Sequence, residues 1–150
     1  KHGIKNTIFR PFSGYGSDQD SNYPFPSIVL RAINHGSKKK FIVWGSGYQM
    51  RDFIHIKDVI RGSLLISKKI KNGKAINLSS GKFMSFISLS KKILKILGKK
   101  DINVMGNSGK PEGVFARGGS TYLQKKYGFV PKISIDQGIK WAIQYFYENK

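Results

Sequence analysis

Arg51 and Arg117 are the residues of this sequence best placed to bind an anion. Each lies in a glycine-rich setting, Arg51 after the turn 45–47 and Arg117 within the loop 106–119. A guanidinium can hold a diphosphate through two parallel hydrogen bonds, and neighbouring glycines let the backbone approach a ligand closely. The two arginines therefore indicate a ligand that carries phosphate.

Trp44, which precedes the same turn, indicates what else that ligand contains. If the runs FIVW and MRDFIHI pair as a hairpin across the turn, Trp44 and Arg51 meet at one end of it. A flat aromatic ring beside a guanidinium would suit a nucleotide base together with its phosphates. A structural alternative stays equally open, in which Arg51 pairs with Asp52 or Asp58 and Trp44 fills the core. Asp52 is expected to hold the turn or to orient Arg51.

The remaining side chains form no convincing catalytic or metal site. The histidines lack the spacing of metal ligands, cysteine is absent, and none of the eight acidic residues forms an evident acid–base couple. The glycine turn fails as a dinucleotide fingerprint, because Met50 stands where a third glycine belongs and a strand follows instead of a helix. His55 lies inside an apolar run and is expected in the core.

The net charge of +19 raises the alternative of a basic nucleic-acid-binding module. Arginine, which dedicated phosphate readers favour, supplies only five of the 27 basic residues. The lysines are scattered, and many fall on the outward sides of expected helices. A solvated, lysine-rich surface is therefore the main interpretation, and nucleic acid is not the expected partner.

Alternating strands and helices predict a single α/β or α+β domain. Strands are expected at 6–12, 41–44, 50–56, 75–80 and 102–105, and helices at 24–36, 58–70, 85–98, 120–127 and 134–149. The caps expected at the starts of four of these helices are Asp58, Ser85, Ser120 and Ser134. No apolar run approaches the roughly 20 residues of a membrane span, and no signal-peptide pattern is present, so a cytoplasmic location is expected.

Six motifs, taken in order, resemble the C-terminal half of the NAD-dependent sugar-nucleotide epimerase/dehydratase family, whose members are extended short-chain dehydrogenase/reductases. The similarity is closest to the GDP-L-fucose synthase and GDP-mannose 3,5-epimerase-like members. The motifs are RPFSGYG (10–16), YPFPSIVLRAI (23–33), FIVWGSGYQMRDFIHIKDV (41–59), AINLSSGK (75–82), KPEGVFARGG (110–119) and KKYGFVPKISIDQGI (125–139).

The resemblance implies an α/β fold, with residues 1–150 forming the C-terminal, substrate-binding part of an extended Rossmann-type enzyme. This part would comprise the last strand of the Rossmann sheet and a small α/β substrate-binding domain, without the N-terminal cofactor-binding domain. The intact enzyme would oxidise a sugar hydroxyl transiently with NAD or NADP, in nucleotide-sugar and surface-polysaccharide biosynthesis. Its Tyr-x-x-x-Lys pair and cofactor loop are expected upstream, so the fragment alone is expected to be inactive. A homodimer is expected for the intact protein.

The resemblance also assigns roles to individual residues. Pro11 and Phe12 correspond to the segment that lies against the nicotinamide. The residues assigned to the nucleotide sugar are Ser13, Trp44, Gln49, Arg51 and Arg117, with the two arginines gripping the diphosphate and Trp44 contacting the nucleotide. The first strand is expected to pair with a parallel sheet outside this chain, which leaves an apolar edge exposed.

Overall fold

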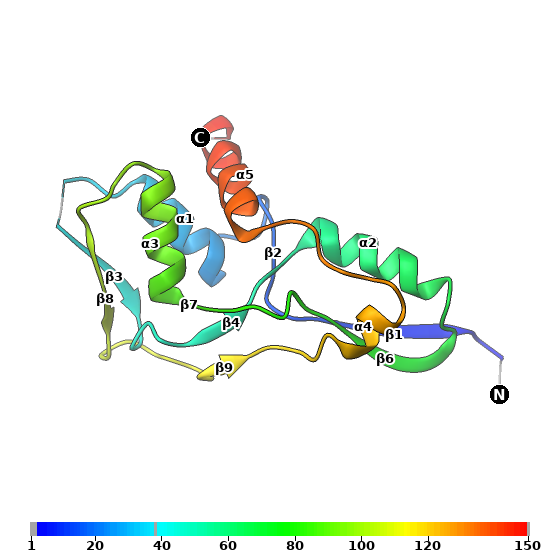
Figure 1. Cartoon of the computed structure of the whole chain (residues 1–150). Coiled ribbons are helices and arrows are strands. Elements are labelled where there is room, and N and C mark those ends of the chain that lie inside the picture. Colours follow the sequence, from blue (N-terminus) through cyan, green and yellow to red (C-terminus); the bar gives the residue numbers. More distant parts are fainter. Residues whose placement is uncertain (1–2, 38, 150) are drawn as a thin grey trace.

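The computed structural model describes residues 3–37 and 39–149 and shows an elongated α/β arrangement (Figure 1). The helices are α1 (Pro24–Ile33), α2 (Ile56–Ser67), α3 (Phe86–Ile96), α4 (Tyr122–Lys126) and α5 (Ile135–Glu148). The strands are β1 (Asn6–Pro11), β2 (Gly14–Tyr15), β3 (Lys40–Trp44), β4 (Met50–Asp52), β5 (Ile54–His55), β6 (Asn72–Leu78), β7 (Phe83–Ser85), β8 (Asn103–Asn107) and β9 (Ala116–Arg117). The expected helices are all present, although α1 and α2 end a few residues earlier than predicted.

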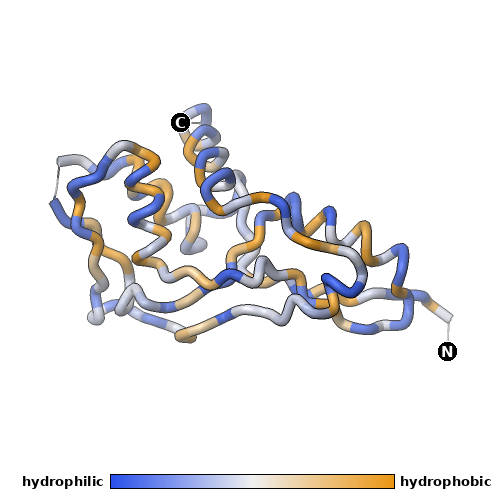
Figure 2. Tube along the Cα trace, in the orientation of Figure 1, coloured by the Kyte–Doolittle hydropathy of each residue, from blue (hydrophilic) through white to orange (hydrophobic). Residues whose placement is uncertain are grey.

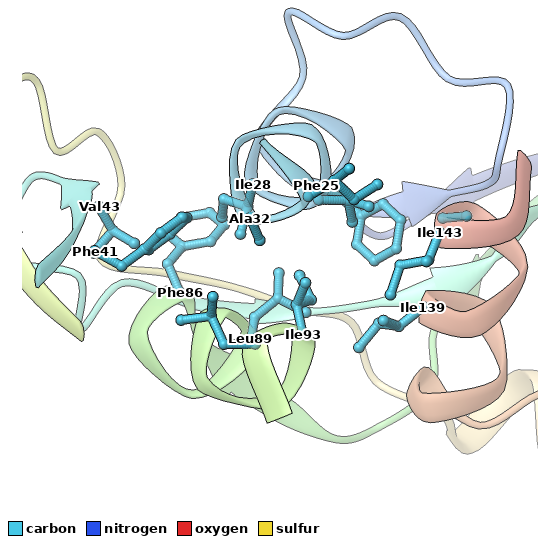
Figure 3. Packing of buried hydrophobic residues seen from close by; sticks show 14 of the residues in the cluster. Phe25, Ile28, Ala32, Phe41, Val43, Phe86, Leu89, Ile93, Ile139 and Ile143 are labelled. Atoms are coloured by element: carbon cyan, nitrogen blue, oxygen red, sulfur yellow. The ribbon is translucent and has the colours of Figure 1, made fainter. Parts of the chain in front are cut away.

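Two hydrophobic clusters divide the molecule along its length. The larger cluster joins α1, α3, α5 and β3, and Figure 3 shows side chains from these elements converging, among them Ile28, Phe41, Leu89 and Ile139. The smaller cluster lies between α2, β6 and Phe129. Hydrophobic and hydrophilic residues alternate along α2, α3 and α5 (Figure 2), as expected for helices that bury one side.

The strands pair mainly across long stretches of sequence. β1 pairs with β6 and β3 pairs with β8, both in parallel, while β4 lies between antiparallel β7 and parallel β9. The predicted hairpin of FIVW with MRDFIHI is therefore wrong. The turn after β3 is bonded elsewhere: Gly45 O accepts from Asn107 N at 2.8 Å, and Gly47 O accepts from Ile87 N at 3.0 Å. These bonds direct the chain toward β8 and α3 before β4 begins.

The junction between β5 and α2 differs from the prediction that Asp58 caps this helix. α2 begins at Ile56, and its N-cap is His55, whose Nδ1 accepts from Lys57 N at 3.1 Å. His55 is buried, as expected, and burial lowers its pKa, so the neutral imidazole that this bond needs is favoured. Asp58 instead accepts from the backbone N–H groups of Lys132 and Ile133, at 2.9 and 2.8 Å, and so holds the segment before α5.

Serine caps at two other helices are confirmed. Ser85 Oγ accepts from Ser88 N at 3.1 Å at the start of α3, and Ser134 Oγ accepts from Gln137 N at 3.2 Å at the start of α5. The prediction for α4 is wrong by one position, because its N-cap is Thr121.

Asp52 is fully buried and joins β4 to the turn 79–81 that follows β6. Its carboxylate accepts from the backbone N–H of Ser80 at 2.8 Å, from that of Gly81 at 3.1 Å, and from the hydroxyls of Ser79 and Ser80. The expectation that Asp52 holds the preceding glycine turn is therefore wrong, and its carboxylate bonds to the turn 79–81 and not to Arg51. The turn that it holds lies elsewhere in the sequence.

The substitution Asp52→Asn should lower stability, because the amide removes the negative charge and replaces one acceptor oxygen with a donor facing other donors. We expect a loss of about 1.5–3 kcal/mol, the range for hydrogen bonds to charged groups. Denaturant titration of the full-length protein measures it. Asp101→Asn, at an exposed position, is the matched control and should change stability little. An equal stability for the two variants would contradict the role given to Asp52.

The 150-residue chain, expressed alone, should be marginally stable or self-associate. Within the described ranges, β1 pairs on one side only, and apolar side chains near its free edge and on α2 are exposed, namely Ile4, Ile8, Ile60 and Leu64. An unpaired edge with apolar neighbours favours association. Analytical ultracentrifugation combined with thermal melting tests this expectation. A monomer with one sharp melting transition would contradict it.

Candidate functional site

Two neighbouring cavities lie beside the start of α1, between β4, α3 and the loop that leads into β9. Each has a volume of about 220 Å³, and both are lined by Pro24, Arg51 and Phe86. The first, here called the Trp44 cavity, is also lined by Asn22, Ser27, Ile28, Arg31, Val43, Trp44, Gln49, Pro111 and Glu112. The second, here called the Ser13 cavity, is also lined by Ser13, Gly14, Gln19, Tyr23, Phe25, Phe53 and Arg117. Arg51 therefore lies between the two cavities.

The five residues assigned to a nucleotide sugar all line these cavities. Trp44 and Gln49 line the first, Ser13 and Arg117 line the second, and Arg51 lines both. They come from three parts of the sequence, namely residue 13, residues 44–51 and residue 117, which the fold brings together.

Pro11 and Phe12, assigned to the cofactor, line neither of these cavities. Pro11 ends β1 opposite Leu78, and Phe12 N donates to Leu78 O at 2.9 Å. The ring of Phe12 packs on Gly119, where an added Cβ would lie 2.5 Å from it. Both residues thus lie at the carboxyl end of β1, apart from the two arginines.

Arg51 and Arg117 are direct neighbours in the parallel pair β4–β9. Within residues 3–37 and 39–149, neither has a carboxylate at ion-pair distance. Arg51 Nη1 donates to Met50 O at 2.8 Å and to Val114 O at 2.9 Å, and its guanidinium lies 5.3 Å from the ring centre of Phe86. Burial, and then the charge of Arg117, lower the pKa of Arg51. Two like charges on facing positions destabilise a sheet, so an anion would relieve this arrangement.

The structural alternative for Arg51 and Trp44 is wrong in both parts. Asp58 pairs with Arg61, at 2.7 Å, and Asp52 bonds to the turn 79–81. Trp44 does not fill the core, since 60% of its surface is exposed. Its ring therefore forms an accessible wall of the cavity, with Lys110 Nζ 5.9 Å from the ring centre.

Gln49 ties together two segments at the rim of the Trp44 cavity. The side chain is 1% exposed, and its Nε2 donates to the carbonyls of Trp44 and Glu112, each at 3.2 Å. Its Oε1 is buried and has no hydrogen-bond partner. Gly45 adjoins it closely: an added Cβ would lie 2.2 Å from Gln49 Nε2, and the φ of +67° also favours glycine.

The Ser13 cavity contains a strained residue and a second buried acceptor. Ser13 has a φ of 40°, a left-handed conformation that non-glycine residues seldom adopt. Gln19 Nε2 donates to Gly14 O at 3.3 Å, while Gln19 Oε1 is buried without a partner. Ser13 follows β1 and Gln19 follows β2, so both residues border the cavity from the part of the chain between β1 and α1.

Sequence reasoning missed several lining residues, among them Gln19, Arg31, Phe86 and Glu112. Phe86 and Arg31 belong to α3 and α1. The spacing of apolar residues in a helix predicts which side is buried, but it does not predict that the end of the helix borders a cavity. Glu112 lies within the motif KPEGVFARGG, and that motif was the only signal for it. Gln19 gave no signal beyond its place in a polar loop.

The described residues contain no group of three or more His, Cys, Asp or Glu side chains placed to hold a metal ion. Nor does any helix in the described part of the chain have the length and apolar character needed to cross a bilayer. Apart from the carboxylate of Glu112, the polar side chains that line the two cavities are arginines and neutral groups.

Comparison with known proteins places this chain in a family. The family model described as the NAD dependent epimerase/dehydratase family matches residues 1–79. A putative GDP-L-fucose synthase of Arabidopsis thaliana is 25% identical over 146 residues, which cover 93% of this chain and 44% of that protein.

Two solved structures share the fold. The UDP-glucose 4-epimerase of Thermotoga maritima, with UDP-glucose, has a TM-score of 0.80 at 25% identity, covering 99% of this chain and 48% of that one. The dTDP-glucose 4,6-dehydratase of Bacillus anthracis, in complex with NAD, has a TM-score of 0.79 at 22% identity, with 95% and 45% covered. The chain spans about half the length of these proteins. The expected extended short-chain dehydrogenase/reductase fold is confirmed, and, because the family model matches more than half of the chain, this protein belongs to the NAD-dependent epimerase/dehydratase family.

Proposed function

We propose that residues 1–150 are the nucleotide-sugar-binding part of an NAD(P)-dependent epimerase/dehydratase of nucleotide-sugar and surface-polysaccharide biosynthesis. The observation that carries the proposal is the facing pair Arg51 and Arg117, which lacks a carboxylate partner in the described residues. A diphosphate supplies the missing negative charge, and its oxygens fit the guanidinium geometry.

The position of Arg51 between the two cavities matches the shape of a nucleotide sugar. Such a molecule has a nucleoside at one end of the diphosphate and a sugar at the other. With the diphosphate at Arg51, the nucleoside enters the Trp44 cavity and contacts the exposed indole. The sugar enters the Ser13 cavity, where Ser13 and the free Oε1 of Gln19 offer polar contacts to hydroxyl groups.

The names of the similar proteins agree with this class of ligand. One is a putative GDP-L-fucose synthase, one an epimerase solved with UDP-glucose, and one a dTDP-glucose dehydratase solved with NAD. They share a nucleoside diphosphate sugar and differ in the base.

The intact protein is proposed to use NAD or NADP, which accepts and returns a hydride during reactions of this class. In the described part of the chain, the glycine turn leaves no space for a pyrophosphate, because the side chains of Val43 and Ile87 pack against it. An added Cβ at Gly47 would lie 2.6 Å from Val43 and 2.7 Å from Ile87. The main cofactor loop is therefore assigned to the part of the enzyme outside this chain. Pro11 and Phe12, at the end of β1, are the residues proposed to adjoin the nicotinamide.

The substitution Arg51→Ala should weaken the binding of nucleoside diphosphates to the full-length protein. Loss of a charged hydrogen-bonded contact worth about 1.5–3 kcal/mol corresponds to a roughly 10- to 150-fold fall in affinity. Isothermal titration calorimetry with GDP- and UDP-sugars measures it. Lys91→Ala, on the exposed side of α3, removes the same charge far from the cavities and should leave affinity unchanged. Unchanged affinity in Arg51→Ala would refute the diphosphate role.

The substitution Arg117→Gln should stabilise the ligand-free protein while it weakens diphosphate binding. Removing one of two facing like charges should raise stability by about 0.2–1 kcal/mol. Added salt should reduce the difference in stability between the variant and the unmodified protein, since it screens the repulsion between the two arginines. Thermal melting at low and high ionic strength tests this, with Arg10→Gln as the control, because Arg10 faces Asn77 in the pair β1–β6. A variant at position 117 that melts below the unmodified protein would contradict the expectation.

A further inference from the structure

We infer that the Trp44 cavity selects guanine among the nucleotide bases. The inference rests on the proposed function and adds the identity of the base, which the similar proteins leave open because their names include GDP, UDP and dTDP. Two hydrogen-bond acceptors in this cavity carry the argument, namely the carboxylate of Glu112 and Oε1 of Gln49.

Glu112 is an exposed acidic side chain in a strongly basic protein, and it forms no ion pair with the described residues. Within the described ranges its carboxylate has no Lys or Arg at ion-pair distance, and the contact that it makes is with the hydroxyl of Ser46, which donates to Oε1. A carboxylate has about four lone-pair sites, so most of its accepting capacity remains free. Glu112 lines the Trp44 cavity, where a ligand can use that capacity.

Gln49 adds a second acceptor whose orientation is fixed by its own bonds. Its Nε2 donates to two carbonyl oxygens, those of Trp44 and Glu112, so the atom left without a partner is the oxygen. The side chain is almost fully buried and lines the same cavity. A buried acceptor without a donor is costly, and an N–H of a bound ligand would satisfy it.

Guanine is the base whose edge matches these acceptors. Its ring N1–H and its exocyclic N2 amino group are adjacent donors, and one carboxylate accepts from both in the manner of a bidentate pair. Uracil and thymine present one ring N–H between two carbonyl oxygens, which a carboxylate repels. Adenine presents an unprotonated ring nitrogen beside its amino group. The indole of Trp44 stacks on any base and does not discriminate among them.

Calorimetry on the full-length protein with GDP, inosine diphosphate and UDP tests the inference. Inosine diphosphate keeps the purine ring and N1–H of GDP and lacks only the N2 amino group. We expect GDP to bind roughly 10- to 150-fold more tightly than inosine diphosphate, the loss expected for one hydrogen bond to a charged group. UDP should bind more weakly than GDP.

The substitution Glu112→Gln should bring the affinities for GDP and inosine diphosphate close together, and it should raise the affinity for UDP because it removes the carboxylate that repels the carbonyl oxygens of uracil. Glu148→Gln is the matched control, since it removes the other glutamate of the chain, at an exposed position in the last turn of α5. In this control the preference for GDP should persist.

Equal affinity for GDP and inosine diphosphate in the unmodified protein would overturn the inference, and so would tighter binding of UDP. Either result would leave the proposed function standing if Arg51→Ala still weakened binding. Failure of all three diphosphates to bind would refute the proposed function itself. The comparison among ligands needs no substitution, so it remains decisive even if a variant at position 112 does not fold.

Discussion

Strand β4 is only three residues long, and the buried carboxylate of Asp52 fixes it to the turn 79–81. Consecutive residues of a strand point to opposite sides, so the burial of Asp52 sends the side chain of Arg51 the other way, toward the cavities. The adjacent arginine and aspartate therefore do not neutralise one another. The aspartate anchors the strand, and the arginine remains available to a ligand.

The sequence was sufficient for the helices and for five of the residues that line the two cavities, but not for the strand pairing or for other lining residues such as Glu112. Helices α3 and α5 follow from an apolar period with a serine at the cap, which are local signals. The hairpin prediction failed because β3 and β4 pair with strands that are distant in the sequence. One of these strands, β9, has only two residues, which is too short to show an alternating pattern. Trp44 and Arg51 still line one cavity, although the turn between them makes no hairpin. The unpartnered oxygens of Gln19 and Gln49 depend on tertiary packing, which no local pattern encodes.

At least one of the many basic residues stabilises the fold. Lys99 Nζ donates to the carbonyls of Ala32, Ile33 and His35, at 2.8, 3.0 and 2.6 Å, where α1 ends. An ammonium group at this position satisfies carbonyls that the helix leaves open and complements the negative end of its dipole. Lys99 thereby links the end of α3 to the end of α1, a helix that lines the Trp44 cavity from Pro24 to Arg31. Part of the net charge of +19 thus has a structural role.

The parallel pairings also bear on how the chain reaches its folded state. Each joins segments that are distant in sequence, and the bond from Arg51 to Val114 alone spans 63 residues. Closing such loops loses chain entropy before the contacts that stabilise them have formed, so a high contact order slows folding. The helices can form early from local signals, whereas the two arginines come together only when β9 reaches β4. The facing pair of arginines is therefore among the last features that this polypeptide forms as it folds.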